Sequence, residues 1–124
     1  MEKYVAALRG ATTLDADSRD EVLDRTAALL EEMMSRNGLE PGDMISLLLT
    51  ATGDVHSEFP AAAVRAAGIS SVPMMCAREL HIDAESHVPL CIRIMAHVYT
   101  ERPRAELRHV YLRGATQLRS DLPT

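Results

Sequence analysis

The sequence predicts an α+β domain in which two helices pack on one face of a mixed β-sheet. Stretches with the period-2 alternation of strands begin the chain and dominate its second half, and one long and one short helical pattern lie between strands. The expected order β-α-β-α-β-β-β is typical of a layered α+β fold. A length of 124 residues suits one domain, which we expect to span residues 1–124.

The first strand and the long helix occupy the N-terminal third. Residues 4–12 alternate as a strand. Asp15 and Asp17 then offer N-caps for a helix, and acidic residues in its first turn suit the helix dipole. Apolar residues recur at helical spacing for about five turns, as far as Asn37–Gly38, which form a C-terminal stop. The methionine-rich stripe of this helix is expected to face the core.

The middle of the chain is expected to hold a strand, a short helix and an edge strand. Residues 44–51 are a nearly continuous apolar run, typical of a central strand covered on both faces. Pro60 suits the first turn of a short helix over residues 61–67. Pro73 lies within the strand-like residues 72–76 and places them near an edge or a bulge, because proline has no N–H for the ladder.

The C-terminal part is expected to complete the sheet. Residues 88–99 alternate, with one aliphatic face and one face that carries Arg93 among apolar neighbours. A helical turn over residues 104–107 and a short strand over residues 109–112 follow. The polar end of the chain, about residues 114–124, is expected to be a mobile tail.

Arg93 needs a negative partner, because a guanidinium keeps its proton and is costly to bury alone. Two partners fit. One is a carboxylate of the same chain, which is the commoner arrangement in proteins; the other is an anionic ligand in a pocket on the open sheet face. Singly, an arginine is more often a surface charge. Several arginines with few acids nonetheless suit a dianionic small molecule, since guanidinium forks match carboxylates. The candidate set is Arg9, Arg65, Arg93, Arg108 and Arg119, with Glu79 and Tyr111.

Composition argues against several classes of partner. A net charge of −5, the lack of a basic run and an aromatic content of 3% speak against nucleic acid. The sequence shows neither a signal peptide nor an apolar stretch of membrane length, so we expect a cytoplasmic protein with no membrane partner. The hydrophobic content of 47% without tryptophan predicts a modest aliphatic core, which oligomerisation would help to bury.

Cysteine and histidine spacings predict no metal site. Cys76-x4-His81 and His87-x3-Cys91 match no zinc finger or ribbon, and the two cysteines suit reduced thiols. Cys76 has no accompanying pattern of a catalytic histidine and carboxylate, and no nucleophile elbow exists. Residues 9–12 contain too little glycine for a phosphate loop. We therefore expect neither a metal nor a covalent nucleophile.

Five short segments occur in a fixed order along nearly the whole chain. They are Leu8–Thr13 (LRGATT), Phe59–Arg65 (FPAAAVR), Val72–Glu79 with Pro73 and Cys76 inside it, Cys91–Arg93 (CIR) and Arg108–Leu112 (RHVYL). Together they resemble the AroH-type monofunctional chorismate mutases. No single segment is specific, but the ordered set is.

The resemblance implies a fold and an activity. The family's fold is a trimer of ferredoxin-like α+β subunits, whose mixed sheets form a central pseudo-α/β-barrel with an active site in each cleft between neighbours. Its reaction is the Claisen rearrangement of chorismate to prephenate, an isomerisation in phenylalanine and tyrosine biosynthesis. The expected partners are therefore this dicarboxylate substrate and two further copies of the chain. The reaction uses no cofactor and no covalent intermediate.

The resemblance also implies roles for individual residues. Arg93 resembles the arginine that faces the breaking ether oxygen of the substrate. Arg9 and Tyr111 resemble the pair that holds the enolpyruvyl carboxylate. Glu79, with Cys76, resembles the partner of the ring hydroxyl.

A second group resembles the wall that a neighbouring subunit adds to the cleft. Its members are Phe59, Ala61, Arg65 and Met75. Arg119 resembles a tail arginine that closes over the ring carboxylate. The chain departs from the family pattern at Ala62, where a lysine can occur, and at Met75, where a threonine can occur. Both positions lie at the expected cleft rim, so the departures bear on affinity more than on chemistry.

Two other functions remain open at the level of sequence. One is a trimeric enzyme of the enamine/imine deaminase type, which also uses a cleft arginine for carboxylates. The other is a carboxylate-binding module without catalysis. The combination of Glu79, Arg93 and Tyr111 favours the mutase over both.

Overall fold

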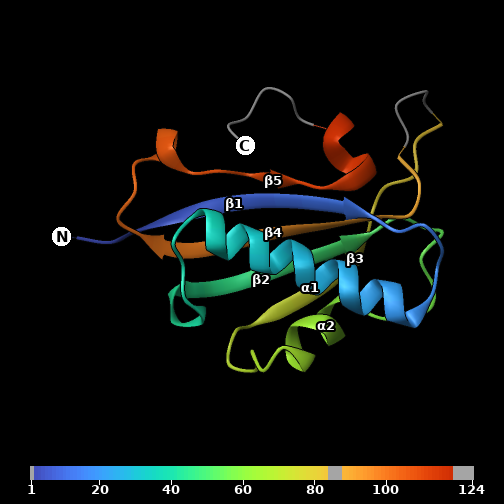
Figure 1. Cartoon of the computed structure of the whole chain (residues 1–124), viewed down its shortest axis with the longest axis horizontal. Helices are drawn as coiled ribbons and strands as arrows, with labels where there is room; N and C mark the ends of the chain where they lie inside the picture. Colours follow the sequence, from blue (N-terminus) through green and yellow to red (C-terminus); the bar gives the residue numbers. More distant parts are fainter. Residues whose placement is uncertain (1, 84–87, 119–124) are drawn as a thin grey trace.

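The computed structural model describes residues 2–83 and 88–118 and contains a five-stranded mixed sheet with two helices on one face (Figure 1). In chain order the elements, with η for a 3-10 helix, are β1 (Tyr4–Thr13), α1 (Arg19–Arg36), η1 (Pro41–Asp43), β2 (Met44–Ala51), α2 (Pro60–Ala66), β3 (Met74–Arg78), β4 (Cys91–Thr100), η2 (Arg104–Glu106), β5 (Val110–Tyr111) and η3 (Arg113–Gln117). The predicted α+β class and the order β-α-β-α-β-β-β are confirmed.

β4 lies at the centre of the sheet, whose strand order is β3-β2-β4-β1-β5. It pairs antiparallel with β1 on one side and with β2 on the other. β3 and β5 join the outer sides of β2 and β1 as short parallel strands. β3 is an edge strand, as predicted, but Pro73 immediately precedes it and does not lie within it; the Pro73 carbonyl accepts the N–H of Leu47 at 2.9 Å.

Ser18 caps the N-terminus of α1, so the prediction of Asp15 or Asp17 is wrong. Ser18 Oγ accepts the N–H of Glu21 at 3.2 Å, and Glu21 Oε1 accepts the N–H of Asp15 at 2.8 Å. Asp17 instead accepts hydrogen bonds from the loop before α2. Several short polar side chains precede this helix, and a tertiary contact decides which of them is left to cap it.

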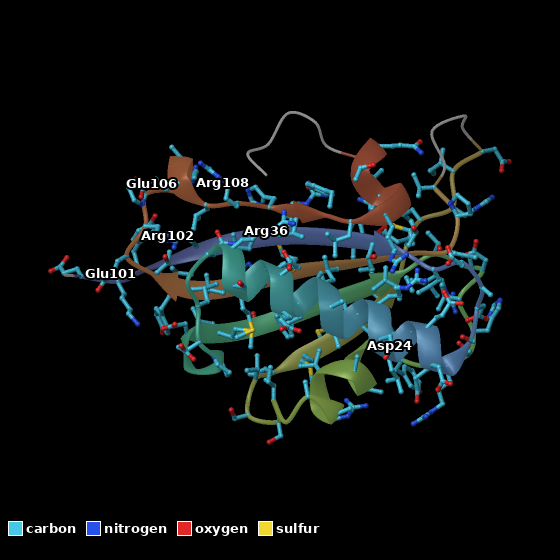
Figure 2. The ribbon with its side chains drawn as sticks, in the orientation of Figure 1. Asp24, Arg36, Glu101, Arg102, Glu106 and Arg108 are labelled. Atoms are coloured by element: carbon cyan, nitrogen blue, oxygen red, sulfur yellow. The ribbon has the colours of Figure 1, made fainter. Side chains whose placement is uncertain are left out.

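Asn37 ends α1 and ties it to a distant segment. The Asn37 side chain is buried; its Nδ2 donates to the carbonyls of Met33 at 2.7 Å and Arg108 at 2.8 Å, and its Oδ1 accepts the N–H of Arg108 at 2.7 Å. Arg102 Nη1 donates to the carbonyl of Arg36 at 2.9 Å and so satisfies another group in the last turn (Figure 2). The C-terminal stop is where the sequence predicts it.

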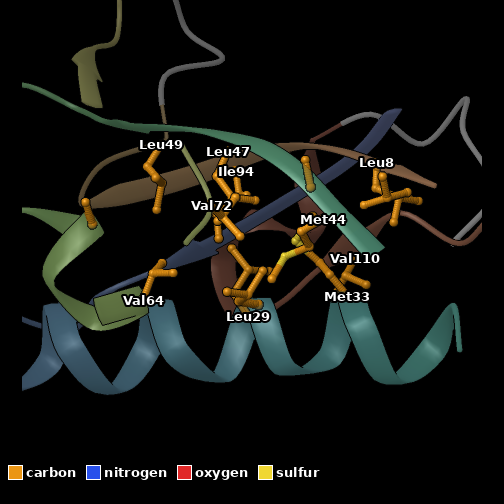
Figure 3. Packing of buried hydrophobic residues seen from close by; sticks show 14 of the residues in the cluster. Leu8, Leu29, Met33, Met44, Leu47, Leu49, Val64, Val72, Ile94 and Val110 are labelled. Carbon is orange, nitrogen blue, oxygen red and sulfur yellow. The ribbon is translucent and has the colours of Figure 1, made fainter. Parts of the chain in front are cut away.

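The hydrophobic core fills the space between the sheet and the two helices (Figure 3). Leu29 and Met33 of α1, Val64 of α2, Leu8 of β1 and Ile94 of β4 all lie in this layer, and all five are at most 1% exposed. Alternate residues of β4 are buried throughout the strand, which confirms its predicted aliphatic face. This core therefore fixes which side chains of β4 face away from the helices.

The described residues cover β2 on one face only. Leu47 and Leu49 are buried at 2% and 0% exposure, whereas Leu48 between them is 40% exposed. The prediction of a strand covered on both faces is thus wrong for this chain taken alone. Both helices pack on the same side of the sheet, so an apolar side chain on the opposite side has no second layer to contact.

The segment after β5 packs on the sheet where the sequence suggests a mobile tail. Ala115 of η3 is 0% exposed and packs with Ala11 and Cys91. Gly114 N–H also donates to Thr13 Oγ1 at 3.0 Å. The tail prediction is therefore wrong for residues 114–118, and residues 119–124 lie outside the described part of the chain.

β1 approaches α1 closely at Gly10, and we predict that Gly10→Ala destabilises the fold. A Cβ at Gly10 would lie 2.5 Å from Met33 Sδ and 3.0 Å from Leu29 Cδ1, both fully buried. Overpacking of this kind costs about 1–3 kcal/mol. The measurement is chemical denaturation, with Gly42→Ala as the matched control because a Cβ there meets nothing within 4 Å. Equal stability of the two variants would contradict the close approach.

Candidate functional site

Arg93 lies on the sheet face that points away from the helices, which we call the open face. The open face carries Val5, Ala7, Arg9 and Ala11 of β1, Leu48 and Thr50 of β2, and Arg93, Met95, His97 and Tyr99 of β4. In the register of the sheet, Ala11 and Thr50 flank Arg93 on the two neighbouring strands. A small and a hydroxyl side chain beside Arg93 leave room around its guanidinium.

A cavity of about 230 Å³ on the open face brings together the four residues predicted to be catalytic, Arg9, Glu79, Arg93 and Tyr111. We call it the Arg93 cavity. Its other lining residues are Gly10, Leu48, Thr50, Ile94 and Met95. Arg9 reaches it from β1, Arg93 from β4, Tyr111 from β5, and Glu79 from the residue that follows β3. The cavity therefore combines two guanidinium groups, one carboxylate and one phenol.

Glu79 pairs with Arg93 across the intervening strand. Arg93 Nε lies 3.1 Å from Glu79 Oε1, but the N–H does not point at that oxygen, so the contact is an ion pair and not a hydrogen bond. Thr50 Oγ1 donates to the same Oε1 at 2.8 Å. Both charged side chains stay partly exposed, at 34% for Arg93 and 23% for Glu79. Arg93 thus has a carboxylate partner in the same chain, which is the commoner of the two arrangements predicted. It also lines a cavity that could take an anionic ligand, which is the other arrangement.

The other two catalytic candidates in the cavity, Arg9 and Tyr111, carry polar side-chain groups that no described residue pairs with. The Tyr111 hydroxyl is buried and has no hydrogen-bond partner among the described residues. No carboxylate within residues 2–83 and 88–118 forms an ion pair with the Arg9 guanidinium, although the Arg9 backbone N–H donates to His109 Nδ1 at 3.0 Å. A buried polar group without a partner is costly, so this corner of the cavity suits an anionic ligand.

The residues predicted to form the wall lie elsewhere in the chain. Phe59 and Cys76 line a separate cavity of about 480 Å³ between the start of α2 and β3. Met75 is 70% exposed and pairs with Leu48 in the sheet register, and Arg65 is exposed on α2. Ala61 is buried in the core at 6% exposure.

The predicted partnership of Cys76 with Glu79 is not found within one chain. Cys76 sits opposite the buried Leu49 in the register of β3 with β2, and so it lies on the helix side of the sheet, whereas Glu79 reaches the open face. Arg119, the tail arginine, lies outside the described residues. Within one chain, the predicted site is therefore not assembled: the four catalytic candidates line the Arg93 cavity, Phe59 and Cys76 line the other cavity, and Ala61, Arg65 and Met75 line neither.

Asp17 anchors the loop that presents Phe59. Its carboxylate accepts the N–H groups of His56 at 2.9 Å and Ser57 at 3.1 Å, and the Ser57 hydroxyl at 2.7 Å. The hydrogen bond from the Ser57 hydroxyl, supported by the two backbone donors, holds the pKa of Asp17 below its ordinary value. Arg19 adds an ion pair with Glu58 at 3.2 Å. The cavity that Phe59 and Cys76 line, which we call the wall cavity, thus has one of its sides attached to the start of α1.

The thiols and imidazoles of the described residues form no metal cluster. Cys76 is exposed, Cys91 is buried, and neither forms a disulfide. Burial raises the pKa of the Cys91 thiol, against the opposing effect of the nearby Arg93 charge. Within residues 2–83 and 88–118, no three His, Cys, Asp or Glu side chains gather closely enough to hold an ion. His87 lies outside those residues. Neither helix there could cross a membrane.

Four residues were not identified from the sequence: Thr50, Leu48 and Met95, which line the Arg93 cavity, and His109, which contacts the backbone of Arg9. The position of Thr50 beside Arg93 depends on the register of β2 with β4, and that register includes a shift between Met44 and Ser46. No pattern in the sequence indicates such a shift. Alternation within residues 88–99 does place Met95 on the Arg93 face, so that residue could have been found.

Comparison with known proteins identifies close relatives of the chain. The family model for chorismate mutase type I matches residues 5–122. The chorismate mutase AroH of Bacillus subtilis is 41% identical over 119 residues, covering 95% of this chain and 92% of that protein. AroH of Thermus thermophilus is 37% identical, with 95% and 96% covered. A solved chorismate mutase from Clostridium thermocellum superposes with a TM-score of 0.86 at 43% identity, covering 91% of this chain and 99% of that one.

We predict that Arg93 contributes little to folding stability. A partly exposed ion pair contributes about 0–1 kcal/mol, and the Arg93–Glu79 contact lacks a directed hydrogen bond. Arg93→Met keeps most of the aliphatic stem and removes the charge, so its free energy of unfolding should lie within about 1 kcal/mol of the parent value. Denaturant titration gives that value. A loss above about 3 kcal/mol would mark the pair as a structural element of the fold.

Proposed function

Because the chain belongs to the chorismate mutase type I family, we propose that it rearranges chorismate to prephenate by electrostatic stabilisation of the transition state. The observation that carries the proposal is the Arg93 cavity, in which Arg9, Glu79, Arg93 and Tyr111 converge from four elements. A site with two guanidinium groups suits a substrate with two carboxylates.

Arg93 is proposed to act on the ether oxygen of the substrate. In this rearrangement the carbon–oxygen bond breaks ahead of carbon–carbon bond formation, so negative charge grows on that oxygen. A fixed guanidinium there stabilises the transition state more than the ground state. The Glu79 contact and the register of β4 hold Arg93 in place before the substrate arrives, so little reorganisation is needed when the charge develops.

Glu79 and the pair Arg9 and Tyr111 are proposed to orient the substrate. Glu79 Oε1 already contacts Thr50 and Arg93, and its second carboxylate oxygen has no protein partner among the described residues. That oxygen suits the ring hydroxyl of chorismate. Arg9 and Tyr111, whose guanidinium and hydroxyl groups have no partner in the described part of the chain, suit the enolpyruvyl carboxylate. Holding both ends of the substrate favours its compact reactive form, and no general acid or base is required.

The working enzyme is proposed to be a homotrimer with its sites between subunits. The open face exposes apolar side chains that a lone chain leaves in water, among them Val5 at 57%, Leu48 at 40% and Tyr99 at 47%. The two separate cavities support the same idea, since the wall cavity of one chain can complete the Arg93 cavity of a neighbour. Phe59, Cys76 and the exposed Arg65 would then meet the substrate from the neighbouring subunit.

The proposed setting is phenylalanine and tyrosine biosynthesis in the cytoplasm. Two unpaired thiols, one of them exposed, suit a reducing compartment.

Chorismate turnover by the purified chain tests the proposal, and Arg93 variants test its mechanism. The parent should consume chorismate and release prephenate, as followed by absorbance and by product identification. Arg93→Ala should lower kcat by about a hundred- to a thousand-fold or more, because a full charge aimed at the growing anion is lost. Arg93→Lys should lie between the two, since ammonium keeps the charge but not the planar fork. A folded Arg93→Ala protein with kcat within a few-fold of the parent would remove Arg93 from the chemistry.

Mixed trimers test whether the sites are shared. Arg65→Ala and Arg93→Ala subunits, inactive alone, should regain activity after unfolding and refolding together, because about a quarter of randomly assembled sites receive both intact arginines. The matched control mixes Arg9→Ala with Arg93→Ala. These two residues line one cavity of one chain, so every mixed site lacks one of them and no activity should return. Equal behaviour of the two mixtures would contradict shared sites.

A further inference from the structure

Two consecutive residues, Arg108 and His109, hold the segment that carries Tyr111 by hydrogen bonds to other parts of the chain. Asn37 holds both the N–H and the carbonyl of Arg108, at 2.7 Å and 2.8 Å. At the next residue, His109 Nδ1 accepts the backbone N–H of Arg9 at 3.0 Å. Figure 2 shows Arg108 on this segment, which runs from η2 toward β5 beside β1. His109 therefore connects Arg9 to the segment that carries Tyr111, and these two residues are proposed to bind the same carboxylate.

The contact fixes the chemical state of the His109 ring. A backbone amide can only donate, so Nδ1 supplies a lone pair and the ring proton is on Nε2. The imidazole takes the place of a backbone carbonyl where the β1–β5 ladder begins. That ladder pairs Gly10 with Val110 and Ala11 with Tyr111, so the His109 contact adds a hydrogen bond at the start of the ladder, directly at Arg9.

Arg9 has few other constraints on its position. It lines the Arg93 cavity and also a neighbouring cavity of about 470 Å³, which His109, His97 and Arg104 line as well. Among the described residues, no carboxylate pairs with its guanidinium. The direction of the Arg9 side chain is thus set mainly by its backbone and by the walls of two open cavities.

We propose that His109 is a positioning residue for Arg9: its imidazole holds the Arg9 backbone so that the guanidinium reaches the substrate carboxylate beside Tyr111. This inference rests on the proposed function, because the carboxylate is that of chorismate. The enolpyruvyl carboxylate keeps its full negative charge throughout the rearrangement, so its contact with Arg9 stabilises the ground state and the transition state about equally. Loss of the His109 contact therefore raises KM and changes kcat little.

Two substitutions of the same shape separate the hydrogen bond from packing. In His109→Asn the amide oxygen is the same number of bonds from Cα as Nδ1, so an acceptor still faces the Arg9 N–H. In His109→Leu that position is a methyl group. His109→Leu should raise KM by about five- to tenfold, the loss expected for one hydrogen bond, with kcat within about threefold. His109→Asn should keep both constants within about threefold of the parent values. Equal KM values for the two variants would overturn the proposal.

A double-mutant cycle with Arg9 tests whether His109 acts through that residue. Arg9→Ala should raise KM by itself, and adding His109→Leu should raise it no further, because there is no longer a guanidinium to position. A residue that merely supports the fold would add its own cost in either background. Multiplication of the two KM effects would therefore overturn the proposal.

The exchange rate of the Arg9 amide proton gives a readout that needs no activity. Exchange should be faster in His109→Leu and close to the parent rate in His109→Asn. If His109→Leu fails to fold, His109→Gln takes its place, because its amide lies one bond farther from Cα and misses the position of Nδ1. Failure of the parent to turn over chorismate would refute the proposed function. Parental KM in a folded His109→Leu protein, with the parent active, would refute only the role of His109.

Discussion

The ion pair between Arg93 and Glu79 connects parts of the sheet that are not neighbours. β2 lies between β3, which carries Glu79 at its end, and β4, which carries Arg93. The contact therefore depends on the register of both pairings of β2, and the Glu79 N–H is itself held by the carbonyl of Ala51 at 2.9 Å. An error of one residue in either pairing would turn one of the two charges toward the core, where it would lack its partner.

Much of this arrangement is visible in the sequence because strands alternate. The period-2 pattern in residues 88–99 places Arg93 opposite the aliphatic face, and the core of β4 has that pattern. The helix stop at Asn37–Gly38 and the edge strand after Pro73 are likewise local properties of the residues involved. The convergence of Arg9, Glu79, Arg93 and Tyr111 was expected from resemblance to a family, not from pattern alone.

Other features depend on contacts between distant residues, which no local pattern contains. Ser18 rather than Asp17 caps α1, because Asp17 is already engaged by the loop before α2. Leu48 on the open face of β2 is exposed because both helices pack on the other face of the sheet. The apolar run of residues 44–51 is typical of a strand that is buried on both faces, so the sequence alone does not indicate this exposure. The start of η3 is held by a hydrogen bond from the Gly114 N–H to the hydroxyl of Thr13, which is 101 positions earlier in the sequence. The composition of the C-terminal segment does not indicate this contact.

The amide of Asn37 has a consequence for the order in which the chain can fold. The Nδ2 and Oδ1 groups of Asn37 form their full set of hydrogen bonds only when Arg108, which is 71 positions away, lies against the end of α1. The nascent N-terminal half therefore carries a polar side chain that has no complete set of partners until almost the whole chain has been made. Long-range closure of this kind slows folding and makes it cooperative, since early structure is not fully stabilised before the C-terminal strand docks.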